Sequence, residues 1–424
     1  GLVGSEMCIR DRAPPCRRRP TRPAWWRVFI VTWGATRPSN VLGMWARRAT
    51  DVGRRVARMA RGAPCRHEHT AHVYISDARD PTLNLAFEDA LLQRHADPVC
   101  FLYRNDACVV IGRNQNLWRE LDMPAMAAAG VPVVRRRSGG GTVYHDTGNL
   151  NFSFHTSKTG FARTTHTALV ARALSAPPVA LPARFGRPPV FLNARNDLAV
   201  LDVAATSDAA EFERKVSGSA YKLTGRRAYH HGTLLLDADL SRMSMLRRRG
   251  ARRCAMHARG VESVPSPVAN LCATFPAHIA RLSPEHVAAA IHAEFARTYG
   301  ACRVVRVDDA QLRADPDVRR SYDELCSWAW IYGAEPHFDV RVSARDGLPQ
   351  AGVPADLVLH LACERGVVSA VEAYTADATV RAAAERLVGV PYDALAIAPP
   401  SAAPPSAAPP RDTCMRRWLR AALW

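Results

Sequence analysis

The sequence predicts a mixed fold of helices and strands that is large enough for more than one domain. Short apolar runs bounded by turn residues are typical of strands, and Cys100–Tyr103 and Cys108–Ile111 flank such a turn. Other segments carry helix signals: Asp80 and Ser283 each supply a capping side chain directly before a proline. The chain has 424 residues, which is enough for a large core and for two domains.

Basic charge is concentrated at the start of the chain. The net charge is +18, and residues 1–66 hold 15 arginines against three acidic residues, a net +12. The rest is only mildly basic and the aromatic fraction is 7%, whereas a nucleic-acid-binding protein spreads both features over its folded body. No nucleic-acid partner is therefore expected.

Cysteine spacing and hydropathy exclude two further classes. The 11 cysteines are scattered, with no Cys-x-x-Cys pair and no zinc spacing, which predicts a reducing compartment and neither a disulfide framework nor a metal site. No apolar run approaches the roughly 18 residues needed to cross a bilayer. We therefore expect no association with a membrane.

Residues 1–66 are predicted to precede the fold. The first twelve residues resemble translated adapter sequence, and we expect the true start at Met44. From Met44 to Arg66, arginines face away from an apolar helical stripe, which is typical of a mitochondrial transit peptide. The alternative is a disordered basic tail. The leader predicts import into the mitochondrial matrix.

The globular part is predicted to begin near His72 and to alternate strands with helices. Leu83, Phe87 and Leu91 are spaced by four after the Asp80 cap, which predicts a helix. A second helix is expected from Ser283 to about residue 299. The predicted strands are 73–75, 100–103, 108–111, 131–134, 143–154, 196–200, 232–236, 358–361 and 367–368.

Changes in composition predict the domain boundaries. A larger domain is expected over residues 67–306 and a smaller one over residues 307–395. Residues 396–424 begin with a repeat of alanine, proline and serine that cannot build a packed core. We therefore expect an extended tail there.

Three consecutive glycines follow an arginine run in the segment RRRSGGGTVYHD, residues 135–146. Glycines let backbone N–H groups face an anion without Cβ obstruction, and a flanking arginine can grip phosphate with two hydrogen bonds. The spacing fits neither common nucleotide-binding glycine motif. A flexible hairpin with solvated arginines remains an alternative at this point.

Lysine is rare, since only Lys158, Lys215 and Lys222 occur. Lys215 opens the small-residue segment KVSGSAYK, where an ammonium group could approach an acyl or phosphoryl oxygen closely. A surface lysine is the plain alternative. His230 and His231 follow, and they could be structural or metal-binding, although no carboxylate or cysteine lies at suitable spacing.

Together these segments resemble the lipoate–protein ligase A and lipoyltransferase family, and most of all its animal mitochondrial lipoyltransferases. Several long motifs occur in the family's order. The matching stretches are residues 83–88, 109–116, 135–154, 195–198, 215–222, 230–237 and 327–333.

The resemblance implies an α/β (α+β) catalytic domain of the biotin/lipoate ligase type with a small C-terminal accessory domain. It implies that Lys215 is the essential lysine, which contacts the activated acyl phosphate. The other implied contacts to the acyl group and nucleotide are Arg136, Ser138, Gly139, Gly140, Gly141, Thr142, Val143, Tyr144, Asn196, Asp197, Lys222 and His231.

The implied reaction moves a lipoyl group from lipoyl-AMP to the amine of a lysine on a partner protein. The expected partners are apo lipoyl domains of 2-oxoacid dehydrogenase E2 subunits and the H protein of the glycine cleavage system. A lipoylated H protein is an alternative donor. No permanently bound cofactor is expected, and we expect a monomer.

A complete lipoate ligase, which would also use ATP and Mg²⁺, is the nearest alternative. Pro267 stands where bacterial ligases often carry arginine, and Ala329 replaces a common acidic residue; both departures favour a transferase. No cysteine lies in the site motifs to carry the thioester of an octanoyltransferase, and a biotin ligase would have a different arginine–glycine loop. An inactive relative that only binds lipoyl domains is a further alternative, which retention of Lys215 disfavours.

Overall fold

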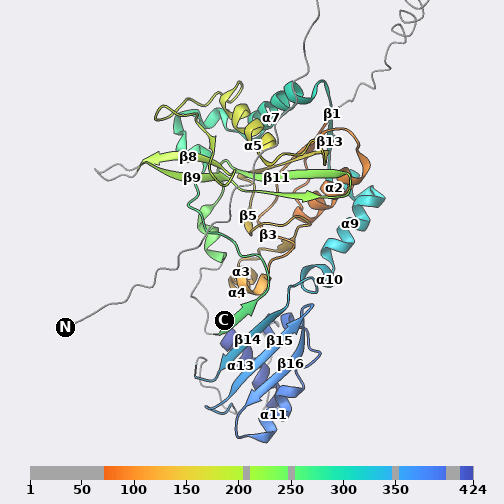
Figure 1. Cartoon of the computed structure of the whole chain (residues 1–424), viewed down its shortest axis with the longest axis vertical. Coiled ribbons are helices and arrows are strands. Elements are labelled where there is room, and N and C mark those ends of the chain that lie inside the picture. The colour runs from red at the N-terminus through yellow and green to blue at the C-terminus, as the bar shows by residue number, and fades with distance from the viewer. Residues whose placement is uncertain (1–70, 204–210, 247–253, 346–352, 398–410, 424) are drawn as a thin grey trace, which may run out of the picture. The chain divides into compact units, whose positions relative to one another are not determined.

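The computed structural model describes residues 71–203, 211–246, 254–345, 353–397 and 411–423 (Figure 1). The chain divides into two units, residues 1–67 and 68–424, and all described residues belong to the second. The predicted leader lies outside them, so the transit peptide stays a prediction. No helix in the described part of the chain is long and apolar enough to cross a membrane.

A six-stranded mixed sheet forms the centre of the larger domain (Figure 1). The order across the sheet is β10-β11-β6-β2-β1-β13, with β1 parallel to both of its neighbours and the other pairs antiparallel. The strands are β1 (Ala71–Ser76), β2 (Val99–Tyr103), β6 (Asn149–Ser157), β10 (Ser219–Leu223), β11 (Arg227–Leu235) and β13 (Cys302–Val307).

Helices cover both faces of this sheet. Along β2, alternate side chains enter two different cores, as the period of two in a strand requires. Phe101 belongs to the core shared with α2 (Pro81–Arg94) and α9 (Pro316–Cys326). Leu102 belongs to the core shared with α5 (Arg163–Ser175) and α7 (Pro284–Tyr299).

Both predicted helix starts are confirmed. The Asp80 side chain accepts the N–H groups of Thr82 and Leu83, and the Ser283 hydroxyl accepts the N–H of His286. Each cap satisfies donors that have no partner within the helix. The remaining short helices of the larger domain are α3 (Leu117–Glu120), α4 (Met123–Ala128), η1 (Leu240–Met245), α6 (Leu271–Thr274), η2 (Pro276–Arg281), α8 (Asp309–Ala314) and α10 (Trp328–Ile331).

Two three-stranded sheets complete the larger domain. Their strands are β3 (Cys108–Ile111), β4 (Val133–Arg135) and β5 (Val143–His145) in one, and β7 (Phe191–Leu192), β8 (Leu198–Val203) and β9 (Glu211–Ser217) in the other. The single strand predicted over residues 143–154 is wrong, because β5 and β6 belong to different sheets. Between them, Asp146 accepts the N–H of Gly148, and a Cβ on Gly148 would lie 2.0 Å from the Asp237 carbonyl oxygen. The glycine therefore permits the close approach that breaks the strand.

The smaller domain is a four-stranded antiparallel sheet with three helices. In spatial order its strands are β12 (Ala255–Ala258), β14 (Phe338–Ser343), β15 (Val358–Glu364) and β16 (Val367–Tyr374). The helices are α11 (Ala378–Glu385), α12 (Tyr392–Ala396) and α13 (Arg411–Leu423). The domain thus takes one strand from before residue 307 and one helix from the segment predicted to be a tail, whose repeat lies mostly outside the described residues. Trp418 of α13 is 1% exposed and lies in the core.

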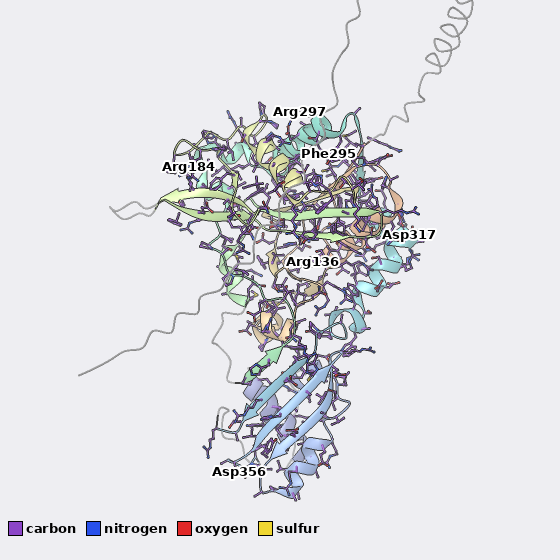
Figure 2. The ribbon with its side chains drawn as sticks, viewed as in Figure 1. Arg136, Arg184, Phe295, Arg297, Asp317 and Asp356 are labelled. Carbon is purple, nitrogen blue, oxygen red and sulfur yellow. The ribbon has the colours of Figure 1, made fainter. Side chains whose placement is uncertain are left out.

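Strand β3 joins the two domains. Val109 and Ile111 share a core with the four-stranded sheet, whereas Cys108 and Val110 share one with α2. Charged side chains of the larger domain differ in their exposure. Arg297 and Asp317 are exposed to solvent, whereas Arg136 is buried in the interior (Figure 2). The predicted mixed fold of helices and strands is confirmed.

Candidate functional site

Two adjoining cavities, of about 370 Å³ and about 1530 Å³, open beside the glycine loop. Residues that line both include Thr142, Lys215 and Ser263. The smaller cavity continues to apolar side chains of α2, β2 and β3, which are Leu85, Tyr103 and Val110. The larger cavity continues along η1 and the loop that follows β12.

The predicted glycine loop connects β4 to β5 and lines the smaller cavity. Gly140 has a φ of +85°, a conformation that favours glycine. A Cβ on Gly112, at the end of β3, would lie 2.1 Å from the Gly140 carbonyl oxygen, and one on Gly141 would lie 3.1 Å from the Ser263 hydroxyl. The glycines therefore allow three backbone segments to meet at the cavity wall.

Arg136 lines the smaller cavity, but most of its guanidinium N–H groups donate hydrogen bonds to the glycine loop and its neighbours. Its Nη2 donates to the carbonyl oxygens of Gly139 and Gly141, its Nη1 to that of Val110, and its Nε to the Ser138 hydroxyl. Burial lowers the pKa of Arg136 to about 10, so it stays charged at neutral pH. Four of the five guanidinium N–H groups are thus used, and Arg136 shapes the loop more than it grips a ligand.

A buried chain of hydrogen bonds runs from Glu88 through His231 and Ser138 to Arg136. His231 Nδ1 lies 2.9 Å from Glu88, and His231 Nε2 lies 2.7 Å from the Ser138 hydroxyl. Burial acts to raise the pKa of Glu88, but the charge and hydrogen bond of His231 hold it below its usual value. An ionised carboxylate only accepts, so His231 Nδ1 donates to Glu88.

This Glu–His–Ser arrangement does not provide a nucleophile. Ser138 is 1% exposed and lines neither cavity, and its hydroxyl already accepts from Arg136. Gly139 likewise lines neither cavity. Ser138 is therefore a buried support of the loop, and Gly139, whose carbonyl accepts from Arg136, belongs to the loop backbone without lining either cavity.

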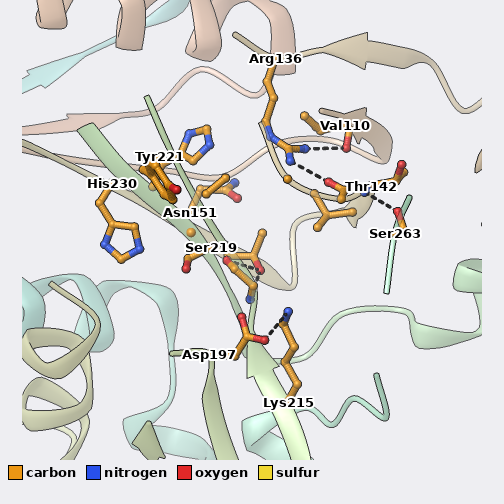
Figure 3. A pocket seen from close by; sticks show the side chains of 18 of the residues that line it. Val110, Arg136, Thr142, Asn151, Asp197, Lys215, Ser219, Tyr221, His230 and Ser263 are labelled. Atoms are coloured by element: carbon orange, nitrogen blue, oxygen red, sulfur yellow. Dashed lines mark hydrogen bonds and ion pairs between the residues drawn. The ribbon is translucent and has the colours of Figure 1, made fainter. Parts of the chain in front are cut away.

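Lys215 projects from β9 into the junction of the two cavities, where its Nζ lies 3.0 Å from Asp197 (Figure 3). Its side chain is 22% exposed, so the ammonium group is accessible to a ligand. A Cβ on Gly218 would lie 3.4 Å from that Nζ, so the Lys215 ammonium group packs close to the turn after the strand. The Lys215 backbone N–H donates to the Pro267 carbonyl, which fixes the strand against the loop of residues 263–268.

A compact turn positions Asp197. The Asn193 side chain accepts the backbone N–H groups of Arg195 and Asp197. Asn196 between them has a φ of +60°, which asparagine tolerates better than most residues. The predicted pair Asn196 and Asp197 thus lines the smaller cavity beside Lys215.

Lys222 lines neither cavity. Its Nζ lies 3.2 Å from Asp89, which also lies 3.1 Å from the Nε of Arg137. Arg137 in turn pairs with Glu324 of α9. Lys222 therefore belongs to a charged cluster that joins α2 and α9 to the start of the glycine loop.

The C-terminal segment around α10 also holds the loop. Trp330 Nε1 donates to the Arg135 carbonyl at 2.7 Å, and the guanidinium groups of Arg113 and Arg137 lie over its ring at 4.4 and 4.8 Å. The Arg135 guanidinium pairs with Glu335 at 2.5 Å, and both side chains are 0% exposed. Burial raises the pKa of Glu335 to about 7, against the opposing effect of Arg135.

Of the other predicted residues, Gly140, Gly141, Thr142, Val143 and His231 line the smaller cavity. Tyr144 lines only the larger one, where it is 4% exposed, and burial raises its pKa to about 12. The structure thus brings most of the predicted set together.

Several residues of the site were not predicted. Ser263 lines both cavities and accepts a hydrogen bond from the buried Gln115, which lines neither, and Tyr221 carries the Arg163 guanidinium over its ring. Gln115 lies within a stretch that carried the family resemblance, but nothing in its local sequence points to a ligand. Only the fold brings it to Ser263, which lies 148 positions away.

Four histidines, of which two line the smaller cavity, are buried and neutral. Burial lowers the pKa of His145, His155 and His230 to about 3 and that of His166 to about 4. Within the described ranges, no group of three or more His, Cys, Asp or Glu side chains could hold a metal ion.

Solved structures of lipoate ligases are similar to this chain. The P. falciparum LipL1 structure in complex with lipoate is 22% identical, with 76% of this chain and 90% of that chain covered and a TM-score of 0.49. The bipartite lipoate protein ligase of Thermoplasma acidophilum, described with its E2 lipoyl domain, is 21% identical, with coverage of 62% and 95% and a TM-score of 0.45. A lipoate-protein ligase A bound with ATP is 22% identical, with coverage of 62% and 98% and a TM-score of 0.45.

The sequence model of the lipoyl protein ligase A/B catalytic domain matches residues 80–296. This match spans just over half of the chain and contains the glycine loop, Asp197, Lys215 and Ser263. It confirms the predicted lipoate-ligase type of catalytic fold and an enzyme of the ligase or transferase kind. The chain therefore belongs to the lipoyl protein ligase A/B family.

Proposed function

We propose that this protein is a mitochondrial lipoyltransferase. It moves the lipoyl group of lipoyl-AMP to the acceptor lysine of apo lipoyl domains, such as those of 2-oxoacid dehydrogenase E2 subunits, or of the glycine cleavage H protein. Membership of the lipoyl protein ligase A/B family supports the chemistry. The arginine-rich leader supports the matrix location.

The single observation that carries the proposal is the meeting of two unlike cavities at Lys215. The smaller cavity ends among Leu85, Tyr103 and Val110, which suits an acyl chain. The larger one has room for a nucleotide. An acyl nucleotide laid across both would place its mixed anhydride beside the Lys215 ammonium group.

The chemistry at this junction is acyl transfer. The neutral amine of the acceptor lysine attacks the acyl carbon, the bond from that carbon to the phosphate oxygen breaks, and AMP leaves as an amide forms and the amine nitrogen releases one proton to solvent. Negative charge grows on the acyl oxygen and on the departing phosphate, and Lys215 stabilises it electrostatically. The acceptor lysine comes from the partner protein, so no covalent enzyme intermediate is needed.

The charges around the larger cavity favour a transferase over a complete ligase. The described residues that line this cavity include three basic and three acidic side chains, whose formal charges cancel. These are Arg119, Lys215, Arg259, Glu120, Glu262 and Asp339. His257 is not counted in this balance. The pyrophosphate group of ATP remains anionic with bound Mg²⁺ and needs more positive charge than one phosphate does. Pro265 and Pro267, which also line this cavity, supply none.

Mass spectrometry of an apo lipoyl domain incubated with this protein tests the proposal. One tube contains lipoyl-AMP, a second contains lipoate, ATP and Mg²⁺, and a third contains a lipoylated H protein. We expect the lipoyl mass increase in the first tube and not in the second. The charge balance given above covers only the described lining, and the five arginines of residues 247–253 lie outside the described residues. The second tube therefore tests directly whether the protein activates free lipoate.

Each other outcome has a distinct meaning. Modification in both of the first two tubes would make the protein a complete ligase. Modification in the third alone would identify the H protein as donor. No modification in any tube would overturn the proposed function.

A further inference from the structure

Ser263 lies at the junction of the two cavities and belongs to a compact knot of hydrogen bonds. The Thr142 backbone N–H donates to its hydroxyl oxygen at 2.9 Å (Figure 3). Gln115 Nε2 donates to the same oxygen at 3.0 Å. The Thr142 hydroxyl donates to Gln115 Oε1 at 2.9 Å. Ser263 is part of the lining of both cavities.

The direction of each bond in the knot is fixed. Gln115 Oε1 accepts the backbone N–H of Gly112 at 2.9 Å, and a backbone N–H can only donate. The amide is therefore oriented with its oxygen toward Gly112 and Thr142 and its nitrogen toward Ser263. The Thr142 backbone group can likewise only donate to Ser263.

This arrangement leaves Ser263 one unused function. A hydroxyl has two acceptor lone pairs and one O–H donor. Gln115 and Thr142 occupy both lone pairs, and no acceptor within the described ranges takes the proton. The O–H is therefore a preorganised donor at the junction that also contains the Lys215 ammonium group.

We infer that Ser263 is a second catalytic group of the acyl transfer, which donates a hydrogen bond to the phosphate oxygens of the acyl nucleotide as the acyl–oxygen bond breaks. The inference rests on the proposed function. The hydroxyl keeps its proton throughout, and no bond to Ser263 forms. It acts beside Lys215 by stabilising charge that grows in the transition state, and its fixed orientation avoids a reorganisation cost.

The packing around Ser263 explains how its position is maintained. Its backbone N–H lies 3.3 Å from Glu120, and the absence of a Cβ on Gly141 leaves room for its side chain. The Asn114 carbonyl accepts the Val261 N–H, which anchors the preceding residues of the loop. The segment that holds the donor is thus anchored by its contacts with Glu120 and Asn114.

Steady-state transfer from lipoyl-AMP to an apo lipoyl domain tests the inference. We expect Ser263→Ala to lower kcat by about 10²-fold or more, the usual effect of losing one preorganised donor, with KM changed less than threefold. Ser263→Thr, which keeps the hydroxyl, should recover most of the rate. Ser157→Ala is the matched control, since Ser157 also accepts a backbone N–H, from Gly160, but lies away from both cavities.

A second variant tests whether Ser263 has only a structural role. Gln115→Met removes one of the two donors to Ser263, while the Thr142 N–H and the Ser263 hydroxyl itself remain, so its loss of kcat should be smaller than that of Ser263→Ala. Equal losses in these two variants, or a loss confined to KM, would overturn the inference and leave the proposed function intact. A wild-type protein that transfers from neither lipoyl-AMP nor a lipoylated H protein would overturn both.

Discussion

At the scale of single residues, the site separates groups that face a ligand from groups that hold them. Lys215 and Ser263 line both cavities and have polar hydrogens directed at their junction. Arg136, Ser138 and His231 form a buried chain whose hydrogen bonds shape the glycine loop. A motif can therefore contain both kinds of residue side by side, and their sequence does not distinguish them.

Replacing Lys215 by alanine should abolish transfer, with a fall in kcat of at least about 10²-fold, because the charge that stabilises the transition state is removed. The thermal unfolding midpoint should fall only modestly, since the Lys215 side chain is partly exposed and Arg195 still lies 4.0 Å from the buried Asp197 carboxylate. Lys158→Ala, at an exposed lysine outside both cavities, is the control. Full activity of the Lys215 variant would refute the proposed mechanism.

At the scale of elements, the glycine loop is held by segments distant in the sequence. Residues of α9, α10 and the turn after α10 contact two of the arginines at its start: Glu324 pairs with Arg137, and Trp330 and Glu335 contact Arg135. The loop that follows β12 holds its far end through Ser263. Because β12 belongs to the four-stranded sheet, the smaller domain contributes to the site through chain continuity as well as through packing.

Glu335→Ala should destabilise the protein by about 3–5 kcal/mol, because it leaves the Arg135 guanidinium buried without a counter-charge. Glu324→Ala removes the half-exposed partner of Arg137 and should cost less than about 1 kcal/mol. Urea unfolding of both variants measures the difference. Similar costs for the two would show that burial of the Arg135 pair is not what makes it important.

At the scale of the whole molecule, two cores meet along β3 and a third covers the far face of the six-stranded sheet. Trp118 lies in the core shared with the smaller domain, where its ring stacks on Tyr332 and meets Tyr392 edge-on. The larger domain, by contrast, buries a group of neutral histidines around the site. Stability of the whole chain should consequently depend on pH.

The free energy of unfolding should fall as the pH drops from 7 to 5.5. The pKa values of His145, His155, His166 and His230 are about 3 to 4 in the folded chain, whereas unfolded histidines take up protons below about 6.5. The unfolded state thus binds more protons in this range, and acid favours it. Glu335, with a pKa raised to about 7, acts in the opposite direction as one group against four.

Urea unfolding at pH 7.0 and 5.5 measures this effect. The net slope should exceed that of one proton, about 1.4 kcal/mol per pH unit. His166→Gln, outside both cavities, should reduce the slope by removing one of the four groups. A stability that is constant or higher at pH 5.5 would contradict the assignment of neutral buried histidines.

The sequence by itself determined the class of the fold, the two long capped helices and the segments that build the site. Capping by Asp80 and Ser283 is decided within a few residues of chain, so local sequence predicts it. The glycine loop and the lysine segment are likewise continuous motifs, and the match to the lipoyl protein ligase A/B catalytic domain includes both.

Only the tertiary structure decided which of those residues face the cavities. Lys222 is turned to Asp89 and Ser138 to His231, whereas Ser263 enters the site because Gln115 and Thr142 hold it there. Each of these partners lies more than 90 positions away, so no local pattern records the contact. A side chain forms hydrogen bonds with the groups that the fold places beside it. In the same way, strand pairing and core packing place β12 and α13 in the smaller domain, although composition predicted β12 in the larger domain and α13 in a tail.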